Sequence, residues 1–144
     1  MKNKISSYFY LYEFVPKEIY ERWGEKSVWF IDRKIVLLAD FIRDRFGKPM
    51  TINNWHEGGP FNYRGFRQRS CEVGGELSQH RFGRGIDFSI GGATIEEIHK
   101  DINYNFDMYS KAGLTTIEDI SFTTNWIHAD VRITNSDKLL IVKP

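Results

Sequence analysis

Histidine and aspartate side chains lie close together in the segment SQHRFGRGIDF, which runs from Ser78 to Phe88. His80 and Asp87 are seven positions apart, and two glycines lie between them. Imidazole and carboxylate groups are common metal ligands, and glycine allows the backbone to bend sharply. The segment therefore indicates either a metal site folded around a loop or a basic, glycine-containing turn that carries no chemistry.

A third candidate ligand lies in NWIHADVRI, residues 125–133, which alternates as a β-strand does. Successive side chains of a strand point to opposite faces, so Trp126, His128 and Asp130 share one face. The opposite face is apolar, and Asp87 alternates in the same way between two apolar neighbours. A buried carboxylate without a partner is costly, and a bound cation removes that cost. The pattern favours a cation site between two strands.

Two histidines and one aspartate form a ligand set that suits zinc, and three protein ligands leave the open position typical of a catalytic site. On spacing alone the motif is weak. A loop histidine, a salt-bridged strand aspartate and a hydrogen-bonded histidine near Trp126 would give the same sequence. The other two histidines carry less weight, because His99 lies among charged residues and His56 lies in a glycine-rich loop.

The segment SQHRFGRGIDF also resembles the S-x-H-x-x-G-x-A-x-D signature of the zinc D-Ala-D-Ala peptidases. This family includes carboxypeptidases and phage endolysins that cut L-Ala-D-Glu bonds in peptidoglycan, and it shares a fold with hedgehog signalling domains. Ser78, His80, Gly83 and Asp87 match the signature, and Gly85 stands where the family has alanine. WIHADVR resembles the second motif of the family, and GKPMTIN, VGGELSQH and YEFV extend the resemblance over about residues 10–133.

The resemblance implies that His80, Asp87 and His128 bind zinc. It also implies that an arginine in the segment NYRGFRQR binds a carbonyl or carboxylate group of the substrate. Arg64 is our first choice for this role and Arg67 is the alternative. Without the resemblance, the same segment would be interpreted as a solvated loop or an anion-binding patch.

Further residues are expected to support the ligands. Ser78 is expected to fix the turn that presents His80, and Asp130 is expected to orient a ligand through a hydrogen bond. Gly83 and Gly85 let the chain bend between the first two ligands.

The catalytic base departs from the family pattern. Many members carry Glu or Asp three residues before the last histidine, whereas this chain has Asn125, which cannot accept a proton. Glu118 and Asp119 are the alternatives. If residues 115–120 pair with residues 125–133, Glu118 falls opposite or nearly opposite His128, and a one-residue shift in register would favour Asp119 instead.

The resemblance implies a zinc-dependent peptidase that cleaves peptide bonds of bacterial peptidoglycan, of the endolysin or D,D-carboxypeptidase type. Its partner would be the stem peptide. Glu118 would transfer the proton, and Arg64 together with the metal would stabilise the developing oxyanion. The alternative is a non-catalytic zinc-binding domain or a virion structural domain on the same scaffold, which Asn125 favours.

The elements that must position these residues predict an α+β domain. We expect a small, mostly antiparallel sheet with helices packed on one side, as in the hedgehog and D-Ala-D-Ala peptidase fold. The helix at residues 27–46 should be capped by Ser27, and the next helix should begin with a capping box of Thr94 and Glu97. The expected helices span 16–23, 27–46 and 94–109, the strands span 50–54, 85–90, 115–120, 125–133 and 138–142, and residues 55–77 form an irregular loop.

Composition narrows the classes of protein. The chain has 144 residues, the length of one domain, and 15% of them are aromatic. A net charge of +1 argues against nucleic-acid binding and against binding to a membrane surface. The single cysteine, Cys71, excludes an intramolecular disulfide. We expect one zinc peptidase-like domain over residues 1–144, acting as a monomer.

The N-terminal segment MKNKISSYFYLYEF does not resemble a signal peptide, because Glu13 interrupts its apolar stretch. No apolar run approaches the roughly 20 residues of a membrane span. We therefore expect synthesis in the cytoplasm, followed by action on the cell wall after release or as part of a phage particle.

Overall fold

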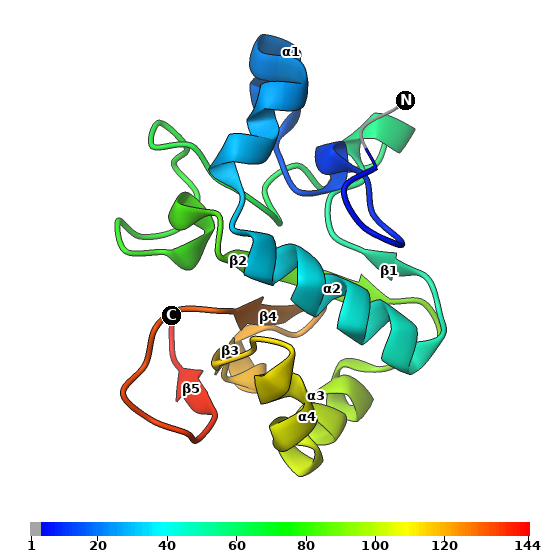
Figure 1. Ribbon diagram of the computed structural model, residues 1–144, viewed down its shortest axis with the longest axis vertical. Helices are drawn as coiled ribbons and strands as arrows, with labels where there is room; N and C mark the ends of the chain where they lie inside the picture. The colour runs from blue at the N-terminus through cyan, green and yellow to red at the C-terminus, as the bar shows by residue number, and fades with distance from the viewer. Residues whose placement is uncertain (1–3) are drawn as a thin grey trace.

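A five-stranded mixed sheet forms the centre of the computed structural model, which describes residues 4–144 (Figure 1). The expected α+β class is confirmed. Three of the strand pairings are antiparallel and the pairing of the last strand is parallel. In order across the sheet, the strands are β1 (Met50–Thr51), β2 (Gly85–Ile90), β4 (Ile127–Asp130), β3 (Thr116–Glu118) and β5 (Leu140–Val142).

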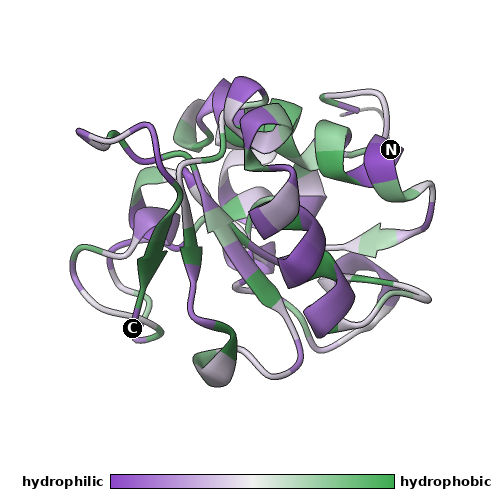
Figure 2. Cartoon of the chain, turned by 90° about the horizontal axis from the view of Figure 1, so that it is seen from below, coloured by the Kyte–Doolittle hydropathy of each residue, from purple (hydrophilic) through white to green (hydrophobic). Residues whose placement is uncertain are grey.

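The register of the central strands sorts polar and apolar residues onto opposite faces. Asp87 on β2 lies directly opposite His128 on β4, and Thr116 on β3 lies opposite Asp130. Cross-strand partners point to the same side of a sheet, so these polar residues share one face. Hydrophobic residues also run along the edge strand β5, beside the C-terminus in Figure 2.

The other face of the sheet is covered by an apolar core shared with the helices. The helices are α1 (Lys17–Trp23), α2 (Arg33–Phe46), α3 (Ile95–Tyr104) and α4 (Phe106–Lys111), and α2 crosses the sheet in Figure 1. On α2, the side chains of Ile35, Leu38 and Ile42 are buried. These side chains belong to one cluster with the buried residues of the sheet, which include Ile86, Phe88, Ile117, Ile127 and Ala129.

The expected helix from Ser27 to Phe46 is wrong at its start. Residues Gly24–Phe30 form a 3-10 helix, and α2 begins only after Asp32, whose carboxylate accepts a hydrogen bond from the Lys34 N–H. Ser27 is buried and its hydroxyl donates to the Ile19 carbonyl at 3.3 Å. Ser27 therefore ties the 3-10 segment to α1 and does not cap α2.

The helix expected at residues 94–109 is two helices. The capping box of Thr94 and Glu97 is confirmed, with both reciprocal hydrogen bonds formed. The chain leaves helical geometry at Asn105, whose side-chain amide donates to the carbonyl and the carboxylate of Asp101. This local bonding competes with the helix. Strand β2 has the predicted bounds, β3 and β4 are shorter than expected at both ends, β1 is shorter at its C-terminal end and β5 is shorter at its N-terminal end.

The long loop at residues 55–77 is confirmed as irregular apart from a 3-10 turn at Trp55–Glu57. Glu18 on α1 anchors it by accepting hydrogen bonds from the side chains of Asn62, Tyr63 and Gln68. Phe66 packs with Leu11, Val15 and Ile19 in a second, smaller apolar cluster. The loop is therefore held on α1 and the N-terminal segment.

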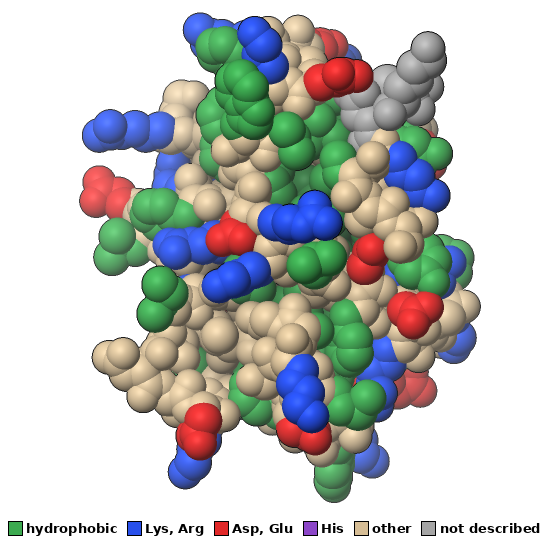
Figure 3. Space-filling view, viewed as in Figure 1, with side chains coloured by type: hydrophobic (Ala, Val, Ile, Leu, Met, Phe, Trp, Pro, Cys, Tyr) green, Lys and Arg blue, Asp and Glu red, His purple; other side chains and the backbone are tan. Residues whose placement is uncertain are grey.

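The surface shown in Figure 3 intersperses basic and acidic side chains, in keeping with the net charge of +1. None of the helices described for residues 4–144 combines the length and apolarity needed to cross a membrane.

Candidate metal centre

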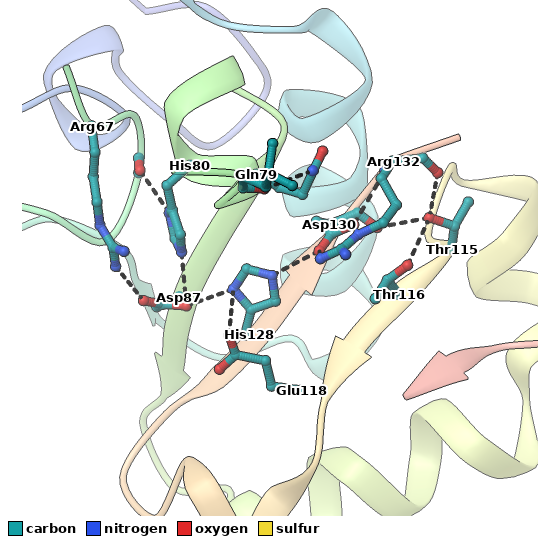
Figure 4. Close-up of polar contacts among 12 residues, drawn as sticks. Arg67, Gln79, His80, Asp87, Thr115, Thr116, Glu118, His128, Asp130 and Arg132 are labelled. Atoms are coloured by element: carbon teal, nitrogen blue, oxygen red, sulfur yellow. Dashed lines mark hydrogen bonds and ion pairs between the residues drawn. The ribbon is translucent and has the colours of Figure 1, made fainter. Parts of the chain in front are cut away.

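Three buried ligand-type side chains converge on the polar face of the sheet (Figure 4). Asp87 comes from β2, His128 from β4, and His80 from a 3-10 turn at Gln79–Phe82 that precedes β2. The Asp87 Oδ1 atom lies 3.2 Å from His80 Nε2 and 3.0 Å from His128 Nδ1. The exposed fractions are 3% for each histidine and 8% for the aspartate. The motifs of the sequence predicted all three ligands, and the structure brings their side chains together.

These distances fit a divalent cation. Ligand bonds of about 2.1 Å in a tetrahedron place neighbouring ligand atoms about 3.4 Å apart. The three ligand atoms all lie within 4.8 Å of one another, and the two aspartate contacts are close to the tetrahedral value. The cluster could therefore hold a metal ion with only small side-chain adjustments.

His80 is oriented by the long loop. Its Nδ1 lies 2.8 Å from the Gly65 carbonyl oxygen, which selects the tautomer that carries hydrogen on Nδ1 and leaves Nε2 free to bind a metal. Phe66, next to that carbonyl, donates its N–H to the Phe14 carbonyl at 2.7 Å. The N-terminal segment therefore holds the Gly65 carbonyl in place, and that carbonyl orients the ring of His80.

His128 is oriented by the expected carboxylate and by one residue that the sequence analysis missed. Its Nε2 lies 2.8 Å from Asp130 Oδ2, so Asp130 takes the supporting position predicted for it. Arg132 clamps the same carboxylate, with Nε 2.8 Å from Oδ1 and Nη2 2.5 Å from Oδ2. Arg132 falls on the same face as His128 and Asp130 in the strand expected at residues 125–133, so the alternation in the sequence could have revealed it.

Asp87 is held by Arg67, the arginine that was our alternative. Arg67 Nη2 donates to Asp87 Oδ2 at 3.1 Å, and Arg67 Nε donates to the Tyr63 carbonyl at 2.7 Å. The side chain of Arg64 turns elsewhere, over the ring of Phe61 at 3.4 Å. Our first choice, Arg64, makes no hydrogen bond to a ligand side chain: its Nη1 donates to Ser89 Oγ on β2 at 3.4 Å, and its backbone carbonyl accepts the Asp87 N–H at 2.7 Å.

The electrostatic balance of the cluster favours a charged aspartate. Burial opposes ionisation of Asp87, but His80 and His128 outweigh it and hold the pKa of the carboxyl far below its usual range. Burial likewise opposes protonation of His128, yet its hydrogen bonds to Asp130 and Asp87 raise the pKa of the imidazole to about 9. Without metal, a proton on His128 therefore supplies the positive charge that a cation would supply.

Glu118 reaches the site and Asp119 does not. Glu118 Oε1 lies 4.0 Å from His128 Nδ1, as the pairing of β3 with β4 predicted. Asp119 points away and accepts hydrogen bonds from the N–H and hydroxyl of Ser121. The side chain of Asn125, at the usual position of the base, is exposed.

The turn that presents His80 differs in one detail from the prediction. Ser78 precedes the 3-10 turn, but its hydroxyl makes no capping hydrogen bond. Its backbone carbonyl instead accepts the N–H of Arg81 at 3.0 Å. Gly83 ends the turn with a φ of +66°, and a Cβ atom there would lie 1.9 Å from the Phe30 carbonyl oxygen. Only glycine fits this bend.

An open cleft of about 590 Å³ gives access to the three ligands. Apolar residues from the long loop, the segment between β3 and β4, and the C-terminal segment form its walls. They are Val73, Leu77, Phe122, Trp126, Val142 and Pro144. His56 and His99 lie outside it: His56 packs against Tyr12, and His99 contacts Asn103 on α3.

Comparisons of the chain with protein-family models, with curated proteins and with solved structures found no match.

Proposed function

We propose that this chain is a zinc-dependent peptidase that cleaves peptide bonds of bacterial peptidoglycan. The observation that carries the proposal is the convergence of His80, Asp87 and His128 at the base of an open cleft, with Glu118 beside them. A set of two imidazoles and one carboxylate suits zinc. The resemblance of SQHRFGRGIDF and WIHADVR to the D-Ala-D-Ala peptidases supports the choice of substrate.

In this proposal the bound metal and the polar residues of the cleft divide the steps of hydrolysis among them. When bound, zinc acts as a Lewis acid that polarises a carbonyl group and makes water more acidic. Glu118 accepts a proton from the attacking water and passes it to the leaving amine. Arg67 holds Asp87 and contributes positive charge to the cleft, where charge develops on the carbonyl oxygen. Asp130 and Arg132 keep His128 in place.

The first experiment combines metal analysis with hydrolysis. Purified protein is analysed for bound metals, and lysis of purified sacculi is followed as turbidity loss with and without a chelator. One zinc per chain together with chelator-sensitive lysis is the expected result. Lysis that persists after complete removal of metal would refute the proposal.

The second candidate function is a non-catalytic zinc-binding or virion structural domain, and the exposed Asn125 at the usual base position favours it. Replacement of Glu118 by Gln separates the two. A peptidase should lose about 10²–10⁴-fold in turnover while retaining its metal. The matched control is Asp119→Asn, because Asp119 is adjacent in sequence but faces away from the cluster. A binding domain should not respond to either substitution.

A further inference from the structure

The guanidinium of Arg81, next in sequence to the ligand His80, is surrounded by backbone carbonyl groups of one loop. A guanidinium carries five N–H donors in a fixed, planar arrangement. Here the donors reach five carbonyl oxygens at distances of 2.8–3.4 Å, those of Gln68, Arg69, Cys71, Gly74 and Gly75. The donor capacity of this side chain is therefore used entirely on a single segment.

That segment, residues 68–78, is here called the cleft loop because it forms one wall of the cleft above the metal ligands. It contains no helix or strand. Val73 and Leu77 project from it with exposed fractions of 46% and 82%. Two backbone hydrogen bonds within the loop, from Cys71 to Gln68 and from Ser78 to Gly75, are too local to fix its overall path. Arg81 adds the five hydrogen bonds that join the first residues of the loop to its middle.

The cleft loop also contacts the residue that holds the aspartate ligand. Gly74 has a φ of +83°, and a Cβ atom there would lie 2.8 Å from Nη1 of Arg67. The other terminal nitrogen of Arg67 binds Asp87. The loop backbone thus packs directly on the guanidinium that supports the metal ligand, and Arg81 fixes the loop in that place.

We propose that Arg81 is a positioning residue that holds the cleft loop as a wall of the metal cleft and so determines how a substrate fits. The structural part of this proposal stands alone, and the part about substrate rests on the proposed peptidase function. Lysine cannot replace Arg81 fully, because an ammonium group has three donors at one point and cannot span five carbonyls.

The test compares Arg81→Gln and Arg81→Lys with the wild-type chain, each loaded with zinc. Arg69→Gln is the matched control, because the Arg69 side chain is exposed on the same loop and the Arg81 bond uses only its backbone carbonyl. The readouts are hydrogen exchange of the loop amides, zinc content, and KM and kcat on soluble peptidoglycan fragments.

In Arg81→Gln we expect amide exchange in residues 68–78 to accelerate at least about tenfold while the amides of the sheet stay protected. Zinc should remain at one per chain. KM should rise about tenfold with kcat nearly unchanged, because ordering the wall contributes to substrate binding before the reaction. Arg81→Lys should fall between the wild type and Arg81→Gln, and Arg69→Gln should match the wild type.

Unchanged loop exchange in Arg81→Gln overturns the proposal, as does an equal effect of Arg69→Gln. If Arg81→Gln unfolds, Arg81→Lys decides: acceleration confined to the loop supports the proposal, and equal acceleration in the sheet overturns it. If the wild-type chain hydrolyses no fragment, the proposed peptidase function fails, and the exchange data still decide whether Arg81 holds the loop.

Discussion

At the scale of single residues, the His80 side chain contributes to the candidate metal cluster more than it contributes to the stability of the fold. Its ring is one of three groups that converge on the metal position, and its other nitrogen contacts only a loop carbonyl. Replacing His80 by Ala should therefore weaken zinc binding by at least about 100-fold, a larger effect than loss of a supporting residue. Elemental analysis after dialysis measures it. His99→Ala, on the surface of α3, is the control, and stoichiometric zinc in His80→Ala would contradict the ligand set.

Binding of the proposed metal should depend on pH through the proton on His128. The pKa of His128 without metal is raised to about 9 because Asp130 and Asp87 stabilise the protonated ring. A metal can bind Nδ1 only after that nitrogen has lost its proton, so proton and metal compete. Zinc affinity should rise about tenfold per pH unit between pH 6 and 8 and level off near pH 9. Competition titration with a chromophoric chelator tests this, and an affinity independent of pH would contradict it.

At the scale of elements, the bend between the His80 turn and β2 is the most constrained connection near the site. Gly83→Ala would combine an unfavourable positive φ with a clash against the Phe30 backbone, so it should destabilise the protein by about 2–4 kcal/mol. Gly91→Ala is the control, because a Cβ atom there would meet nothing nearer than 3.8 Å. Denaturant unfolding compares the two, and equal stabilities would show that the bend relaxes.

The contact between α1 and the long loop should depend on pH through Glu18. Burial opposes ionisation of Glu18, but hydrogen bonds from Tyr63, Gln68 and Asn62 outweigh it and lower the pKa to about 2. A carboxyl whose pKa is lower in the folded state stabilises the fold above its unfolded pKa, near 4.5. That stabilisation is lost as the pH falls from about 4.5 to about 2.

Glu18→Gln should therefore cost about 1 kcal/mol at neutral pH, a small value because the carboxylate is exposed to solvent. It should also flatten the stability profile between about pH 4.5 and 2, relative to the wild type. Urea unfolding at a series of pH values measures both effects. Glu21→Gln, on the same helix with a single exposed ion pair to Lys17, is the control. Parallel profiles for wild type and Glu18→Gln would argue against the contact.

The sequence predicted the positions of side chains best where strand alternation or the pairing of adjacent strands determines them. Alternation placed His128 and Asp130 on one face, and the pairing of β3 with β4 placed Glu118 near His128. The sequence alone could not show that β2 and β4 are neighbours, because pairing between strands that are far apart in the chain leaves no local pattern. Nor could it choose between Arg64 and Arg67, since an irregular loop has no period.

The predicted helix boundaries were wrong where more than one residue could begin or end the helix. Ser27 and Asp32 are both good N-cap residues, and the choice was made by a 3-10 segment between them that buries Ser27 against α1. Asn105 ended α3 because its side chain bonds back to Asp101. Packing and side-chain hydrogen bonds of this kind appear only in the folded chain.

At the scale of the whole molecule, the metal cluster and the apolar core lie on opposite faces of the same sheet. The core of α2, α3 and the buried strand residues forms without any contribution from the ligands. The cluster itself is connected without metal, because Asp87 binds both histidines and Arg67, and Asp130 binds His128 and Arg132. The fold should therefore survive loss of the metal, with reduced stability.

Chelation tests this separation of core and site. If zinc occupies the cluster as proposed, zinc at 100 times its dissociation constant would stabilise the folded state by about 2.7 kcal/mol, which for a domain of this size would raise Tm by about 5–10 °C. Treatment with a chelator should lower Tm by that amount, leave the far-ultraviolet circular dichroism unchanged and be reversed by added zinc. His80→Ala, which cannot complete the site, should show no chelator effect. Complete unfolding on chelation would mean that the metal, and not the core beneath α2, holds β2 and β4 together.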